Sequence, residues 1–116
     1  MDDAIIQRLI DDQSGKCATC WRLFDQTPPH LHHAIIPKGH TNYKKFKKWL
    51  DMAENLILVC WICHQDHGDL TCYFQRLCFW SDKVNMGYDM RAWLDSIPMR
   101  DKEEFIHIGE KKELEG

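Results

Sequence analysis

Two pairs of cysteines constrain the fold of this chain more than any other feature. Cys17 and Cys20 form one Cys-x-x-Cys pair, and Cys60 and Cys63 form the second. The two-residue gap within a pair lets both sulfur atoms face one ion, and zinc prefers four tetrahedral ligands. One pair alone is also typical of redox proteins, but two pairs in a short chain indicate a structural Zn²⁺. The alternative is that the four residues are two accidental pairs of buried thiols.

The segment between the two pairs is too long for a simple zinc ribbon. It spans 39 residues, whereas a ribbon places about 15–20 residues between its pairs. A sizeable structure is therefore inserted between the halves of the zinc site, and it carries four of the seven histidines. The other two cysteines, Cys72 and Cys78, lack this spacing, and we expect them to be packed thiols in a C-terminal helix.

Hydrophobic periodicity predicts short strands with helices around them. The pattern predicts helices at roughly 2–13, 43–54, 64–83 and 88–96, and strands at 30–37 and 56–59. The chain has 116 residues, which suits one domain. We place that domain at residues 1–105, with its core at 17–67 and C-terminal helices at 68–97. Residues 106–116 are highly charged, and we expect them to be a flexible tail.

Charge is unevenly distributed along the chain. The formal net charge is −3, which argues against nucleic acid as a partner because DNA-binding proteins usually carry a basic footprint. Residues 22–48, however, hold six Lys or Arg residues against one acid. Local charge decides where a polyanion binds, and the candidate DNA-binding residues in this segment are Lys38, Lys44, Lys45, Lys47 and Lys48. The alternative is that the lysine run is the solvated face of a helix.

The sequence shows no signal for a membrane or for secretion. No apolar run approaches the ~18 residues of a membrane span. The N-terminus is acidic and amphipathic, without the basic region and cleavage site of a signal peptide. We therefore expect a cytoplasmic protein with no membrane partner.

Five of the seven histidines fall into two groups, and a Cys-x-x-Cys pair precedes each group. His30, His32 and His33 lie on a predicted strand, while His64 and His67 lie three residues apart at the start of a predicted helix. A shared zinc ion would tether this strand and this helix. Imidazole groups suit divalent transition metals, so the clustering indicates a second metal site. For a single histidine, a helix cap or a surface position is an equally good interpretation.

The order of these motifs resembles that of the HNH family of endonucleases. The matching segments cover about residues 17 to 67 and are CATC, LHHAIIPK and ENLILVCWICHQDH. The resemblance implies an α+β fold with a small ββα-metal core, a four-cysteine zinc site and flanking helices at both ends. It also implies a metal-dependent enzyme that hydrolyses phosphodiester bonds of DNA.

The resemblance also implies roles for individual residues. His33 would be the general base, His32 and His64 would be ligands of one catalytic divalent ion, and Asn55 would brace the loop that orients His33. His67 is a further candidate ligand, although it follows His64 by three residues where many members of the family have four. The expected catalytic ion is Mg²⁺ or Mn²⁺, with Ni²⁺ or Co²⁺ as substitutes in vitro.

Two other functions stay open at this level. The chain could be a binding module, stabilised by structural zinc, that binds nucleic acid without cutting it. It could also be a nuclease subunit that needs a protein partner or a second copy of itself, as its short length and acidic C-terminus suggest. Phage packaging, host defence and mobile elements all use domains that look like this one.

Overall fold

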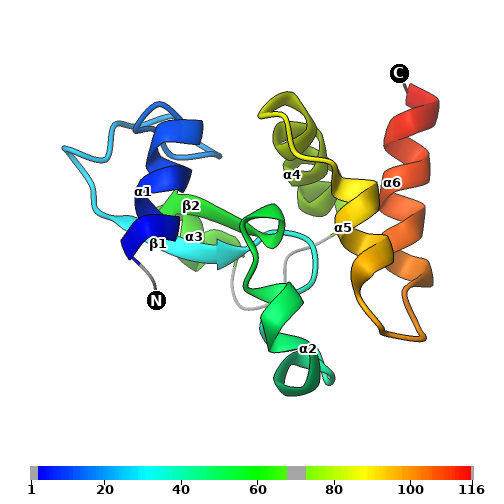
Figure 1. Cartoon of the computed structure of the whole chain (residues 1–116). Helices are drawn as coiled ribbons and strands as arrows, with labels where there is room; N and C mark the ends of the chain where they lie inside the picture. The colour runs from blue at the N-terminus through cyan, green and yellow to red at the C-terminus, as the bar shows by residue number, and fades with distance from the viewer. Residues whose placement is uncertain (1–2, 68–72, 116) are drawn as a thin grey trace.

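A pair of short strands, with helices before, between and after them, makes up the computed structural model, which describes residues 3–67 and 73–115. The elements in chain order are α1 (Asp3–Asp12), β1 (Pro29–His33), α2 (Tyr43–Leu50), the 3₁₀ turn η1 (Ala53–Asn55), β2 (Leu56–Cys60), α3 (Trp61–His67), α4 (Tyr73–Asn85), α5 (Met90–Ser96) and α6 (Glu103–Glu115) (Figure 1). This confirms the predicted α+β class with flanking helices. None of the described helices is long and apolar enough to cross a membrane.

Strand β2 lies between two hydrophobic clusters. It pairs antiparallel with β1, from Pro29 opposite Cys60 to His33 opposite Leu56. Every residue of β2 is buried. Side chains alternate across a strand, so Leu56 and Leu58 pack with Leu9 of α1 in one cluster, while Ile57 and Val59 join the larger cluster with the C-terminal helices. Burial on both faces explains why β2 is apolar at every position.

Gln13, the residue directly after α1, fixes the first Cys-x-x-Cys turn against β2. Its side-chain amide donates to Leu58 O at 2.8 Å and to Lys16 O at 2.8 Å, and its carbonyl oxygen accepts from Leu58 N at 2.8 Å. Ala18 N also donates to Leu58 O, at 3.1 Å. These bonds bring Cys17 beside the end of β2, where the second cysteine pair begins.

Two predicted elements are shorter in the structure than in the sequence analysis. The strand predicted at 30–37 ends at His33, because the next peptide groups bond to Asn55: Ala34 N donates to its main-chain oxygen at 2.8 Å, and two following N–H groups bond its side chain. The helix predicted at 43–54 ends at Leu50 and is followed by the 3₁₀ turn. The chain therefore turns twice next to β1, once after His33 and once after Leu50.

Two predictions for the second half of the chain concern helix bounds and cysteines. The helix predicted at 64–83 is observed as two helices, α3 and α4; residues 68–72 between them, with Cys72, lie outside the described part. The prediction that Cys78 is a packed thiol is wrong, since its side chain is exposed. The helix predicted at 88–96 starts at Met90, after Asp89 caps it by accepting a hydrogen bond from Ala92 N at 3.0 Å.

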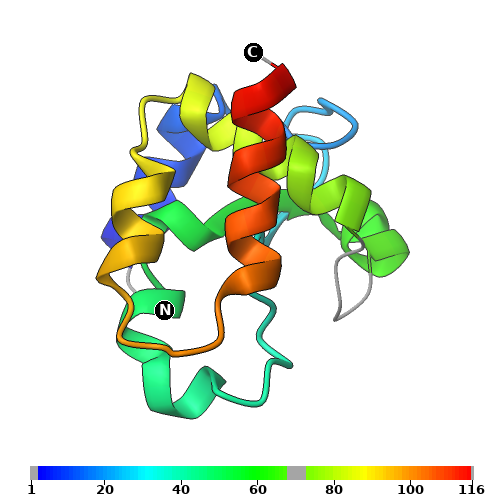
Figure 2. The ribbon, with the colours of Figure 1, turned by 90° about the vertical axis from the view of Figure 1, so that its right-hand side faces the viewer.

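The C-terminal segment is helix α6, and the prediction of a flexible tail at 106–116 is wrong for its described residues. Helix α6 packs beside α4 and α5 (Figure 2). Phe105 and Ile108, three residues apart, are completely buried, and Gly109 lies directly against the Trp80 ring. The narrow apolar stripe at this spacing anchors the helix although most of its other residues are charged or polar.

Candidate metal centre and nuclease site

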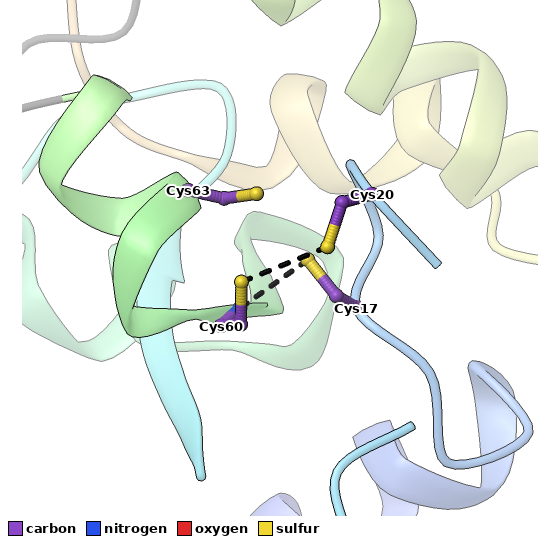
Figure 3. Close-up of side chains that lie close together, drawn as sticks. All are labelled: Cys17, Cys20, Cys60 and Cys63. Atoms are coloured by element: carbon purple, nitrogen blue, oxygen red, sulfur yellow. Dashed lines mark hydrogen bonds between the residues drawn. The ribbon is translucent and has the colours of Figure 1, made fainter. Parts of the chain in front are cut away.

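The four paired cysteines form one cluster, in which the side chains converge (Figure 3). Their sulfur atoms all lie within 4.8 Å of one another, and Cys20 Sγ is 3.7 Å from Cys60 Sγ. Four sulfurs bound to one tetrahedral zinc at about 2.3 Å are about 3.8 Å apart. The donor set and its spacing therefore fit the predicted structural Zn²⁺.

The electrostatics of the cluster also suit a cation. Burial acts to raise the pKa of Cys17, but backbone N–H groups of Cys20, Cys60 and Thr19 outweigh it and lower the pKa to about 7. Two of these donors lie 3.2 Å (Cys60 N) and 3.4 Å (Thr19 N) from the Cys17 sulfur. Burial and the neighbouring sulfurs raise the pKa of Cys63 well above its ordinary value. A bound divalent ion would relieve this crowding of thiolates.

The two predicted metal ligands, His32 and His64, lie next to each other. Their ring centroids are 5.4 Å apart and the rings are nearly perpendicular. His32 is buried, and Phe79 of α4 packs on its ring with a centroid distance of 5.8 Å. His64 projects from α3, directly after the second cysteine pair, so the cysteine cluster also sets its position. The side chain of the third candidate, His67, lies outside the described part.

His30 belongs to the same group, although no individual ligand or catalytic role was predicted for it. Its Nδ1 lies 3.4 Å from His64 Nδ1, and the two ring centroids are 5.5 Å apart. His30 and His32 are two residues apart on β1, and side chains at that spacing share one face of a strand. This spacing is the sequence signal that would have placed His30 beside the other two.

His33 faces away from that group and contacts an acidic residue. Its Nε2 lies 2.8 Å from Asp51 Oδ1. Tyr43 packs edge-on against the His33 ring, and its hydroxyl donates to both Asp51 oxygens at 2.9 and 3.0 Å. Lys47 donates to Asp51 Oδ2 at 2.7 Å. The carboxylate thus accepts from three side chains, and it orients the imidazole of His33.

These donors also determine the charge state of Asp51. Burial acts to raise its pKa, but the hydrogen bonds from His33, Lys47 and Tyr43 outweigh burial and hold the pKa below its ordinary value. Asp51 is therefore a carboxylate at neutral pH. Sequence patterns did not single out this residue because it lies inside the helix predicted at 43–54, 18 positions from His33, and no motif connects the two.

Asn55 occupies the centre of the loop contacts next to His33. Its side chain is completely buried. Its Oδ1 accepts from Ile35 N at 3.0 Å and from Ile36 N at 2.9 Å, and its Nδ2 donates to Ile36 O and Leu50 O at 2.9 and 2.8 Å. All four groups are main-chain groups of the segments that flank His33 and Asp51. This geometry is what a loop brace requires, and the effect of the brace on His33 stays a prediction.

The comparison with protein families covers the segment that carries these clusters. Residues 17–70 match the model of the HNH endonucleases. This segment belongs to the HNH family. Its four-cysteine cluster is consistent with the zinc-binding branch of the family, and an HNH domain implies a nuclease-type function on DNA. Neither the curated proteins nor the solved structures contain a match to the chain.

The predicted DNA-binding lysines of the HNH domain lie on its surface. All five are exposed, and four of them lie on α2, whose apolar residues Phe46 and Leu50 are buried. Lys47 bonds to Asp51, whereas Lys45 and Lys48 lie over the rings of Phe46 and Trp49, with 5.5 and 5.4 Å to the ring centroids. Helix α2 therefore carries exposed positive charge, and the same helix contacts the His33 side of β1.

Proposed function

We propose that this HNH domain is a metal-dependent endonuclease that hydrolyses phosphodiester bonds of DNA, with His33 as the general base. The supporting observation is that two adjacent histidines of β1 contact different groups. The strand directs His32 towards His64 and directs His33 towards Asp51. A candidate ligand and a candidate base therefore leave adjacent positions of one strand in opposite directions.

His33 can accept a proton through its Nδ1. Its Nε2 lies at hydrogen-bond distance from the Asp51 carboxylate, and a carboxylate only accepts, so the proton of the neutral ring belongs on Nε2. The lone pair on Nδ1 is then available to a water molecule. Imidazole is the side chain best suited to exchange a proton near neutral pH. As the water loses its proton to Nδ1, its oxygen attacks phosphorus and the bond to the leaving oxygen breaks.

The predicted ligand residues would hold the ion that acts on the phosphate. Imidazole nitrogens of His32 and His64 are donors that a divalent transition ion accepts, and these residues would hold the predicted catalytic ion. When bound, such an ion neutralises phosphate charge and stabilises the leaving oxygen as a Lewis acid. Phe79 packs on His32 and restricts the orientations of its ring. The cysteine cluster holds the start of α3, and with it His64, against β1.

The substrate would approach along α2. Lys44, Lys45 and Lys48 are exposed on this helix, while Tyr43 and Lys47 from the same helix hold Asp51. Lysines that neutralise phosphates supply most of the sequence-independent affinity for DNA. Helix α2 would therefore bind the DNA backbone and also hold the carboxylate that orients the general base, His33.

A cleavage assay with supercoiled, linear, branched and single-stranded DNA tests this proposal. The purified chain is incubated with Mg²⁺ or Mn²⁺ beside His33→Ala. Loss of a general base lowers the rate by about 10²–10⁴-fold. His107→Ala makes the same change at an exposed histidine of α6 and should leave cleavage unchanged. Equal cleavage by wild type and His33→Ala would contradict the assignment, and binding without cleavage in either metal would favour a binding module.

A further inference from the structure

We propose that His30 is a third imidazole ligand, together with His32 and His64, of one divalent ion, and that this ion is a transition metal rather than Mg²⁺. The inference rests on the proposed function and names the metal chemistry of the same site. Neither the family resemblance nor the predicted site residues include His30 as a ligand.

Strand geometry brings the three rings together. His30 and His32 lie opposite Val59 and Ile57 of β2, on the face of β1 that α3 covers. The ring of His64 lies edge-on to both, with centroid distances of 5.5 Å to His30 and 5.4 Å to His32. His64 therefore lies beside two strand residues. The nitrogens of His30 and His64 are at hydrogen-bond distance, and His32 adjoins this pair through its ring contact with His64.

The separation of two nitrogens fits a shared ion. His30 Nδ1 and His64 Nδ1 are 3.4 Å apart. Two nitrogens that bind one ion at about 2.1 Å with a tetrahedral angle are about 3.4 Å apart. A direct hydrogen bond between nitrogen and its acceptor is usually about 2.7–3.2 Å long. The observed distance is that of a long hydrogen bond, and it also matches the spacing of two ligands of one ion.

The three histidines are buried to different extents, so that their cluster is open to solvent on one side. His32 is buried beneath Phe79, whereas His30 and His64 are each partly exposed. Catalytic metal sites keep three protein ligands and an open position for water or substrate. Three imidazoles are also softer donors than the oxygen ligands that Mg²⁺ requires. Among the expected ions, this set favours Mn²⁺, Co²⁺ or Ni²⁺ over Mg²⁺.

Mn²⁺ binding to the zinc-loaded protein tests the proposal without any cleavage assay. Electron paramagnetic resonance measures free Mn²⁺, and elemental analysis of each variant checks that zinc at the cysteines is retained. His30→Phe keeps a ring in place without nitrogens, and His30→Gln keeps a side chain that can hydrogen-bond His64. We expect both to weaken Mn²⁺ binding by at least about 100-fold, the upper end of the loss caused by removing an outer hydrogen bond. His107→Ala should bind Mn²⁺ as the wild type does.

The outcomes separate this inference from the proposed nuclease. If His30→Gln binds Mn²⁺ within about tenfold of the wild type, the lower end of the loss expected from an outer hydrogen bond, then His30 only positions His64 and the third ligand is wrong. In that case His32→Ala should still abolish binding, and the nuclease proposal stands. If His32→Ala also retains binding, the ion is held elsewhere and both proposals for this site fail. An excess of Mg²⁺ that displaces Mn²⁺ from the wild type contradicts the predicted selectivity.

Discussion

Asn55 and Ile36 exchange two hydrogen bonds: Asn55 Oδ1 accepts from Ile36 N, and Asn55 Nδ2 donates to Ile36 O, both at 2.9 Å. The side-chain amide thereby pairs with a peptide group as a neighbouring strand would. Because Asn55 is completely buried, water cannot replace either bond. The segment after His33 is thus held to the turn that follows Asp51.

Replacement of Asn55 by alanine should therefore destabilise the protein strongly. Asn55→Ala leaves two buried N–H groups and two buried carbonyl groups without partners. A buried unsatisfied group costs about 1–3 kcal/mol, and we expect the free energy of unfolding to fall by about 3 kcal/mol in total. Urea denaturation of the zinc-loaded protein measures the change. A loss below about 1 kcal/mol, the value for one ordinary hydrogen bond, would show that the brace is dispensable.

Removal of one cysteine ligand should remove the zinc. Cys60→Ser replaces a buried thiol at the end of β2, and folding of small zinc domains depends on the metal. We expect less than one equivalent of zinc by elemental analysis and loss of the cooperative thermal transition. Cys78→Ser is the matched control, because that thiol is exposed on α4 and outside the cluster. Retention of zinc by Cys60→Ser, with an unchanged melting curve, would contradict a four-cysteine site.

The Asp51 carboxylate should stabilise the protein only above acidic pH. Its pKa lies below the ordinary value of 3.8 in the folded chain. A group with a depressed folded pKa adds stability above the unfolded pKa, and that stability is lost as the pH falls through the folded pKa. The difference in unfolding free energy between wild type and Asp51→Asn should therefore be constant near neutral pH and shrink below about 3.8. Urea denaturation of both proteins from pH 3 to 7 measures it, and a difference that does not depend on pH contradicts the pairing.

The lysines of α2 should determine how DNA affinity depends on salt. Each phosphate contact contributes about −0.9 to the slope of log affinity against log salt on duplex DNA. Lys44→Gln combined with Lys48→Gln should make the slope less negative by about 1.8. Fluorescence anisotropy at several salt concentrations, with the catalytic ion omitted, measures this slope. Lys111→Gln, at an exposed position of α6, is the control. An equal slope for all three proteins would mean that α2 has a solvated face and no contact with DNA.

Packing of α6 can be tested at Gly109. Alanine usually stabilises a helix relative to glycine by about 1 kcal/mol. A Cβ at position 109, however, would lie 2.7 Å from Trp80 Cζ2, and overpacking costs about 1–3 kcal/mol. We expect Gly109→Ala to lower the melting temperature. A higher melting temperature would show that α6 is held loosely against α4.

Sequence patterns predicted the parts of this protein that depend on local spacing. The two-residue gap lets both sulfurs of a cysteine pair face one ion, and two such pairs predicted one cluster, which the structure forms. Side chains at adjacent positions of a strand point to opposite faces, which is why His32 and His33 of β1 contact different groups. The apolar run from Leu56 to Val59 predicted a buried strand, since a strand covered on both faces has no polar side.

Tertiary structure decided the partners that come from distant segments. Asp51 reaches His33 because the chain turns back after α2, and its role depends on Tyr43 and Lys47 as well. The contact of His30 with His64 depends on how α3 lies across β1. Helix α6 is stable because α4 offers a surface for Phe105 and Ile108. The sequence alone predicted the two cysteine pairs as one cluster, because the backbone sets the spacing of side chains within each pair. Packing decided which groups the two faces of β1 contact, because that depends on the position of every neighbouring element.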